Sequence, residues 1–112
     1  MNIKILLTVT LICLGLAAAA EDRIISQAYE VALSDFRAPA TPNGGVAFKP
    51  CSNCERISVR VTPATRYSIN GKSVRLEDFR TAVRQASDRD KKGVIVLHHL
   101  ESDTIQSLDV SI

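Results

Sequence analysis

The sequence has little excess of charge of either sign, which argues against whole classes of partner. Its 112 residues carry 14 Lys and Arg against 12 Asp and Glu, for a formal net charge of +2. Nucleic-acid-binding domains need a concentrated basic surface to contact phosphates. The basic residues between positions 75 and 92 alternate with acidic ones, so we expect a solvated surface there and no nucleic-acid partner.

Recognisable catalytic motifs are also lacking. No G-x-S-x-G segment is present to carry a nucleophilic serine, and Gly44-Gly45 lacks the lysine of a phosphate-binding loop. The residue after the second cysteine of the C-x-x-C pair is Glu55, whereas covalent haem attachment needs a histidine there. We therefore expect no cofactor, and the sequence leans away from an enzyme.

The longest hydrophobic run lies at the N-terminus, from Ile5 to Leu16, after Lys4 and before residues 17–20, which are all alanine. This order of charged, apolar and small residues is typical of a secretory signal peptide. The run is shorter than the roughly 20 residues that a membrane-spanning helix needs, which disfavours an uncleaved anchor. We expect residues 1–20 to be a signal peptide and residues 21–112 to be one small domain in the bacterial periplasm, without a membrane span.

Cysteine is scarce, and its few positions are informative. Of the three cysteines, Cys13 lies in the expected signal peptide, so the exported domain holds only Cys51 and Cys54. In an oxidising compartment these two thiols can pair with each other, and Ser52 and Asn53 between them favour a tight turn. A disulfide that closes so short a loop contributes only about 2 kcal/mol. That is still a useful share of a small domain's stability, so the sequence favours a structural disulfide.

Two chemical alternatives for this cysteine pair stay open. Thioredoxin-like proteins place such a pair at the N-terminus of a helix, which lowers a thiol pKa, whereas Cys54 leads toward an expected strand; exchange-active disulfides nevertheless occur on other scaffolds. In a metal-binding alternative, Cys51 and Cys54 supply half of a zinc site and His98 or His99 adds a ligand. Neighbouring residues of a strand point to opposite faces, so only one of these histidines would reach the same metal.

Alternation of apolar and polar residues predicts several strands, near residues 29–33, 46–48, 57–61, 66–69 and 107–112. Asn70-Gly71 predicts a tight hairpin turn, because both residue types tolerate positive φ. The continuous apolar run GVIVL, residues 93–97, predicts a strand that is covered on both faces. RAPATPNGG, residues 37–45, predicts a flexible loop.

The apolar period changes to that of a helix over VRLEDFRTAVRQAS. Leu76, Phe79, Val83 and Ala86 share one helical face, and acidic residues lie near the start, as the helix dipole favours. We expect one amphipathic helix from about residue 75 to 88. Several strands, one helix and two further strands predict the α+β class, as a small antiparallel sheet with the helix packed on one face.

The segment VTPATRYSINGKSVRLEDFR resembles a group of small proteobacterial proteins that carry a signal peptide and have no known function. Members share a C-x-x-C, a VTPATRY strand, an NG turn, a helix that opens on V-x-L-x-D-F, and a closing hairpin, so the resemblance covers most of residues 21–112. The shorter segment SINGKSVRLEDFRTAV is similar to the periplasmic strand-turn-helix unit of the ExbD and TolR transport proteins, which keep an N-terminal membrane anchor and lack the cysteine pair. The resemblance supports export and implies no site residues.

Together these features predict a non-catalytic envelope domain, stabilised by a Cys51–Cys54 disulfide, that binds or supports another envelope protein or a ligand. The alternative is a thiol-disulfide exchange or metal-handling protein that uses Cys51 and Cys54, with His98 or His99 as a further metal ligand.

Overall fold

A computed structural model describes residues 25–112 of the chain. The expected signal peptide, residues 1–20, lies outside the described residues, as does Cys13. The elements, in chain order, are β1 (Ser26–Ala32), the 3-10 helix η2 (Leu33–Asp35), β2 (Phe36–Arg37), β3 (Gly45–Phe48), β4 (Ile57–Arg60), β5 (Arg66–Ile69), β6 (Lys72–Val74), α1 (Leu76–Gln85), β7 (Gly93–His99) and β8 (Thr104–Ser111).

The structure belongs to the predicted α+β class, but its sheet is larger than expected and it is mixed. Eight strands form one sheet in the order β1-β7-β8-β4-β3-β2, and β5 joins it by pairing with both β8 and β6. Strand β8 pairs antiparallel with β7 and parallel with β4 and β5. The expectation of a small antiparallel sheet is therefore too simple, because β4 and β5 run in the same direction beside β8.

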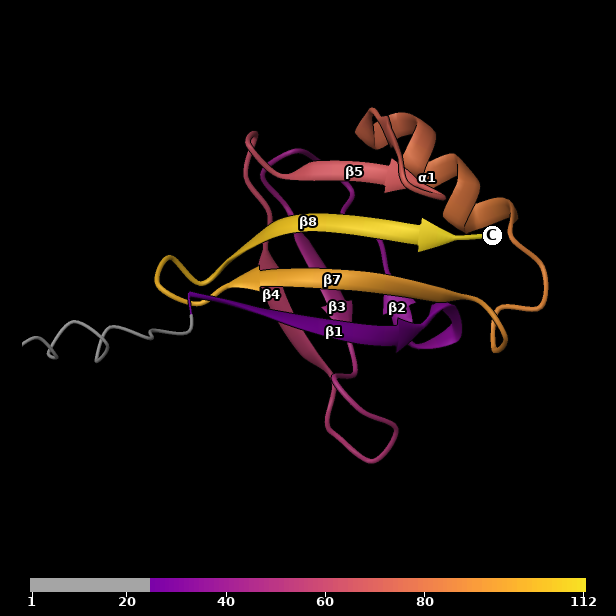
Figure 1. Cartoon of the computed structure of the whole chain (residues 1–112), viewed down its shortest axis with the longest axis horizontal. Helices are drawn as coiled ribbons and strands as arrows, with labels where there is room; N and C mark the ends of the chain where they lie inside the picture. The colour runs from indigo at the N-terminus through magenta and orange to yellow at the C-terminus, as the bar shows by residue number, and fades with distance from the viewer. Residues whose placement is uncertain (1–24) are drawn as a thin grey trace, which may run out of the picture.

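The sheet is folded over on itself, so that its two parts form two layers (Figure 1). Strands β1, β7, β8 and β5 lie side by side in front, and β2, β3 and β4 cross behind them at a steep angle. The layers are joined where β4 meets β8, at the single residue pair Arg60 and Thr104. The space between the layers holds the core.

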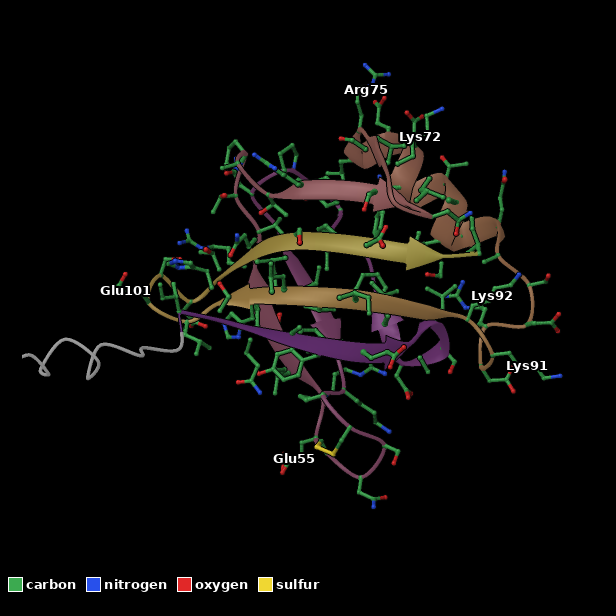
Figure 2. All side chains as sticks on the ribbon, in the orientation of Figure 1. Glu55, Lys72, Arg75, Lys91, Lys92 and Glu101 are labelled. Carbon is green, nitrogen blue, oxygen red and sulfur yellow. A yellow bond between two sulfur atoms is a disulfide. The ribbon has the colours of Figure 1, made fainter. Side chains whose placement is uncertain are left out.

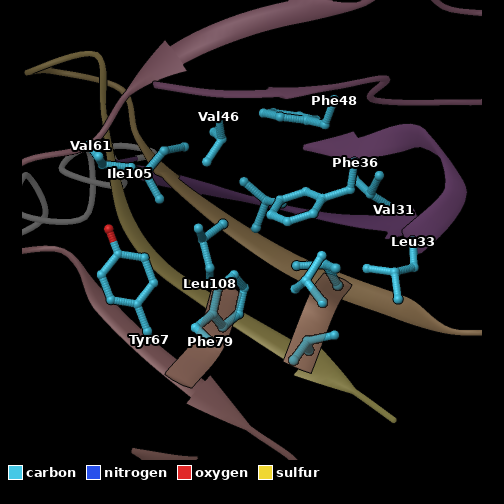
Figure 3. Close-up of a cluster of buried hydrophobic side chains, with 14 of the residues drawn as sticks. Val31, Leu33, Phe36, Val46, Phe48, Val61, Tyr67, Phe79, Ile105 and Leu108 are labelled. Carbon is cyan, nitrogen blue, oxygen red and sulfur yellow. The ribbon is translucent and has the colours of Figure 1, made fainter. Parts of the chain in front are cut away.

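Alternate residues of the strands fill this core, as Figure 3 shows. Val46 and Phe48 of the rear layer face Val94, Val96 and other apolar residues of the front layer, and all four of these side chains are completely buried. The other buried hydrophobic residues are Val31, Leu33, Phe36, Val59, Val61, Tyr67, Phe79, Val83, Ile105, Leu108 and Val110. Because side chains alternate along a strand, the residues between them point away from the core.

The chain bends between β4 and β5, and hydrogen bonds of two threonines hold the bend. The Thr65 hydroxyl donates to the carbonyl oxygen of Ile105 on β8 at 2.6 Å, and it accepts from the backbone N–H of Thr62 at 2.9 Å. Pro63 lies at the tip of the bend and has no N–H to give to a ladder. The two strands therefore continue in the same direction, and both can pair in parallel with β8.

The helix α1 is shorter than predicted and covers an open side of the core rather than one face of a flat sheet. It ends at Gln85, because Ala86 is extended, whereas the sequence suggested an end near residue 88. Its Phe79 ring lies 5.4 Å from the ring of Tyr67 on β5 and 6.2 Å from that of Phe36 on β2. Phe79 thus joins the two layers at this side of the molecule.

Strand β7 was predicted to be covered on both faces, and this prediction is wrong. Val94 and Val96 are completely buried, while Ile95 between them is 40% exposed and Leu97 is half-buried. The helix lies at the side of the sheet, beyond β5 (Figure 1), so it does not reach the outer surface of β7. Only alternate side chains of this continuous apolar run therefore face the core.

Candidate functional site

The predicted disulfide is present, at the tip of the loop between β3 and β4. The sulfurs of Cys51 and Cys54 are bonded and their Cα atoms lie 5.0 Å apart, while the backbone N–H of Cys54 donates to the carbonyl oxygen of Cys51 at 3.1 Å. In Figure 2 the sulfur bond lies beside Glu55, on a loop that projects from the rest of the molecule. The loop is therefore closed both by the disulfide and by a backbone hydrogen bond.

The surroundings of the disulfide bear on its chemistry. Cys51 is an exposed residue and Cys54 is half-buried. The chain after Cys54 enters strand β4 and not a helix. A helix N-terminus, which lowers the pKa of the attacking thiol in thioredoxin-like proteins, therefore does not follow this pair.

His98 and His99 lie at the end of β7, where they hold the turn that leads into β8. The Nε2 atom of His98 is 2.7 Å from the Oδ1 atom of Asp103, and the Nδ1 atom of His99 is 2.9 Å from the Ser102 hydroxyl. The side chain of His98 is only 12% exposed, and its ring lies 6.4 Å from that of Tyr29. Each imidazole thus has one nitrogen bonded within its own turn, while the Nδ1 atom of His98 is buried and has no hydrogen-bond partner among the described residues.

The structure does not bring the sequence's candidate metal ligands together. The cysteine loop projects at one end of the view in Figure 2, while Glu101 marks the β7–β8 turn at another. Across residues 25–112 there is no group of three or more His, Cys, Asp and Glu side chains placed to hold a metal ion. The same part of the chain has no helix long and apolar enough to cross a membrane.

The structure reveals a surface that the sequence did not predict, which we call the outer face. It consists of the side chains of β1, β7, β8 and β5 that point away from the core, among them Ala28, Glu30, Ile95, Leu97 and Asp109. Exposed or half-buried apolar groups lie near its middle, on β1 and β7, and polar groups lie toward β5. Because the helix lies beyond β5, this face is open to solvent (Figure 1).

Polar side chains on the β5 side of the outer face are engaged with one another. The Asp109 carboxylate accepts hydrogen bonds from the Ser68 hydroxyl at 2.5 Å and from the backbone N–H of Gly71 at 3.1 Å. The side-chain oxygen of Asn70 accepts from the backbone N–H of Ile112 at 2.9 Å. These contacts hold the β5–β6 hairpin against β8, so their role is structural.

A second surface feature is a hollow beside the start of α1, with a volume of about 410 Å³. Ala40, Pro42 and Leu76 give it apolar walls, and Arg75 and Arg80 border it. A neighbouring hollow of about 350 Å³ extends to Tyr67, whose pKa is raised by burial. The sequence does not predict this feature, because the 39–44 loop and the helix are distant along the chain.

Comparison with known proteins identified no relative of this chain. The chain matches no protein-family model, no curated protein and no solved structure. The function is therefore argued from the surfaces and side chains described above.

Proposed function

We propose that this chain is an exported, non-catalytic envelope protein, a binding or accessory domain that the Cys51–Cys54 disulfide stabilises. Support comes from the hydrogen bonds that its polar side chains make. His98, His99 and Asp109 all bond to neighbours that hold turns in place, and this is a structural use of groups that an enzyme would direct toward a substrate. The N-terminal sequence supports export to the periplasm.

The observation that carries the proposal is the open outer face. Strands of a small domain usually bury one face and solvate the other with polar side chains. Here β1 and β7 place Ala28, Ile95 and Leu97 on the solvated face, and Ile95 is 40% exposed. An apolar centre with a polar border is the usual composition of a protein-binding surface. The expected partner is another protein of the envelope.

A photo-crosslinking amino acid placed at Ile95 tests this proposal in the native periplasm. The matched control carries the same group at Gln85, which is exposed on α1, away from the outer face. We expect a discrete crosslinked species from position 95 that is absent from position 85. The crosslink should disappear when Leu97 is changed to Glu in the same chain. Equal crosslinking from both positions, or none from position 95, would contradict binding at this face.

A second candidate function is thiol-disulfide exchange, and the exposure of Cys51 at the tip of a projecting loop favours it. In this alternative a partner's thiolate attacks the Cys51 sulfur, a mixed disulfide forms, and Cys54 leaves as a thiolate. Intact mass of the periplasmic protein, with and without alkylation, separates the two functions. A structural disulfide resists alkylation until strong reduction, whereas an exchange-active pair is alkylated after mild reduction. Zinc in the native mass spectrum would instead indicate metal handling.

A further inference from the structure

The free edge of β1 is the longest unprotected strand edge in the described part of the chain. β1 has seven residues and pairs only with β7. The other terminal strands, β2 and β6, have two and three residues, and they carry the exposed cations Arg37 and Lys72. Short length and positive charge are the usual protections of a strand edge. β1 has neither protection, nor a proline, and Glu30 is its only charged residue.

The hydrogen bonds at both ends of β1 show which of its residues direct their backbone N–H and C=O groups toward the free edge. Leu33 donates its N–H to the carbonyl of Lys92, and Leu100 donates its N–H to the carbonyl of Ile25. Residues 25 and 33 therefore direct their backbone groups toward the β7 side. The register between β1 and β7 is regular, and hydrogen-bonded positions alternate in an antiparallel pair. The odd-numbered residues of β1 thus bond to β7.

The even-numbered residues Ser26, Ala28 and Glu30 consequently direct their N–H and C=O groups away from β7. Ala28 and Glu30 are exposed, and Ser26 is half-buried. In Figure 1, β1 forms the border of the front layer. An exposed row of backbone donors and acceptors in strand geometry is a template for a further strand.

We propose that this edge pairs with the same edge of a second copy of the chain, as an antiparallel dimer with a two-fold axis at Ala28. An antiparallel pair of identical strands uses the same donors and acceptors on both sides, as a two-fold interface requires. In this register Ala28 faces its own copy, and Ser26 faces Glu30 in both directions. The two Glu30 carboxylates, which are the only charges on the strands, never oppose each other.

The neighbouring register is less favourable. A two-fold axis at Tyr29 would place Glu30 opposite Ala28 and bring the two carboxylates to diagonal positions, where like charges repel. The axis at Ala28 separates these charges and places a small side chain at the centre. The dimer also joins the two front layers into one continuous sheet, so that the apolar residues Ile95 and Leu97 of both copies lie on one extended outer face.

Sedimentation velocity of the exported form, with its disulfide intact, tests the dimer over a concentration series up to the high micromolar range. We expect a monomer-dimer equilibrium. Ala28→Pro removes the central N–H of the free edge, and the β7 ladder does not use this N–H. Loss of the two symmetric hydrogen bonds should weaken dimerisation roughly ten- to a hundredfold. Ala28→Lys should have a similar effect, whereas Gln85→Lys, which adds the same charge on the helix, should have none.

A single cysteine at the proposed two-fold axis tests the register of the dimer. It also gives a positive signal, which a variant that merely fails to fold would not give. Cα atoms of a hydrogen-bonded antiparallel pair lie about 5.5 Å apart, within the range for a disulfide. Ala28→Cys should therefore form a crosslinked dimer under mild oxidation, while Ile95→Cys should not. A monomer throughout the concentration series would overturn the proposal. So would a dimer that Ala28→Pro and Ala28→Lys leave unchanged, or one that crosslinks at position 95 and not at position 28.

Discussion

The hydroxyl of Thr65 donates a 2.6 Å hydrogen bond to the carbonyl oxygen of Ile105, forty positions further along the chain. Thr65 is 8% exposed and belongs to the bend between β4 and β5. The bond joins the bend to β8, the strand with which both β4 and β5 pair. One buried polar side chain thus connects the two layers of the folded sheet.

Replacement of Thr65 by valine should therefore destabilise the protein. Valine keeps the shape of the side chain but leaves the Ile105 carbonyl and the Thr62 N–H without this partner. An unsatisfied buried polar group costs about 1–3 kcal/mol, so we expect the free energy of unfolding in urea to fall by that amount. Thr41→Val, at an exposed loop position, should change it by less than about 0.5 kcal/mol. Equal effects of the two substitutions would contradict a structural role for this hydroxyl.

Removal of the disulfide should cost the protein modest stability. The bond closes a very short loop, so Cys51→Ser with Cys54→Ser should lower the free energy of unfolding by about 2 kcal/mol. Reductant should lower the stability of the wild-type protein by a similar amount and leave the double variant unchanged. Urea unfolding with and without reductant measures both effects. A structural disulfide predicts that the double variant keeps the Ile95 crosslink, whereas a thiol-exchange protein would lose its activity.

Tyr67 should make the free energy of unfolding decrease at alkaline pH. Burial raises the pKa of its hydroxyl above the usual value of 10.0, because the low-polarity core disfavours the phenolate. Below pH 10 the group is neutral in both the folded and the unfolded chain. As the pH rises above 10, the unfolded chain loses this proton more readily than the folded one, so the free energy of unfolding falls. Denaturation curves between pH 8 and 11 should show this decline.

The variant Tyr67→Phe separates this effect from general alkaline unfolding. The Tyr67 hydroxyl is buried and has no hydrogen-bond partner among the described residues, so its removal breaks no bond. We expect Tyr67→Phe to be as stable as the wild type at pH 7, or more stable by about 1 kcal/mol. Its stability should also fall less steeply above pH 10. A clear loss of stability at pH 7 would indicate that the hydroxyl has a partner.

The β5–β6 turn provides a test of backbone conformation. Gly71 has φ of +84°, and a Cβ atom added there would meet nothing within 4 Å. Gly71→Ala should therefore lose about 1–2 kcal/mol of stability through the left-handed conformation alone. Gly45→Ala lies in strand β3, where the added Cβ would make only ordinary contacts at 3.4 Å. This control should be neutral or slightly stabilising, as thermal unfolding can show.

Local patterns account for much of the fold. Asn70 and Gly71 both have positive φ in the observed hairpin, as the sequence predicted, because a tight turn depends on its own two residues. The alternation in ISVRV and SLDVSI correctly indicated β4 and β8, and the spacing of Phe79 and Val83 indicated the helix. The short spacing of Cys51 and Cys54 predicted their disulfide. Each of these features is determined by residues within a few positions of one another.

The tertiary structure alone decided how these elements are arranged. The parallel pairing of β4 and β5 with β8 joins residues about forty positions apart, and local periodicity carries no information on such pairs. Arg89 reaches the carbonyl oxygens of Val83 and Leu33, so contacts from outside the segment take part where the helix ends. The open side of β7 and the free edge of β1 depend on where the helix and the second layer lie. The sequence by itself therefore determined most of the strands, the presence of the helix and the disulfide, whereas long-range hydrogen bonding and packing decided which surfaces remain open for binding.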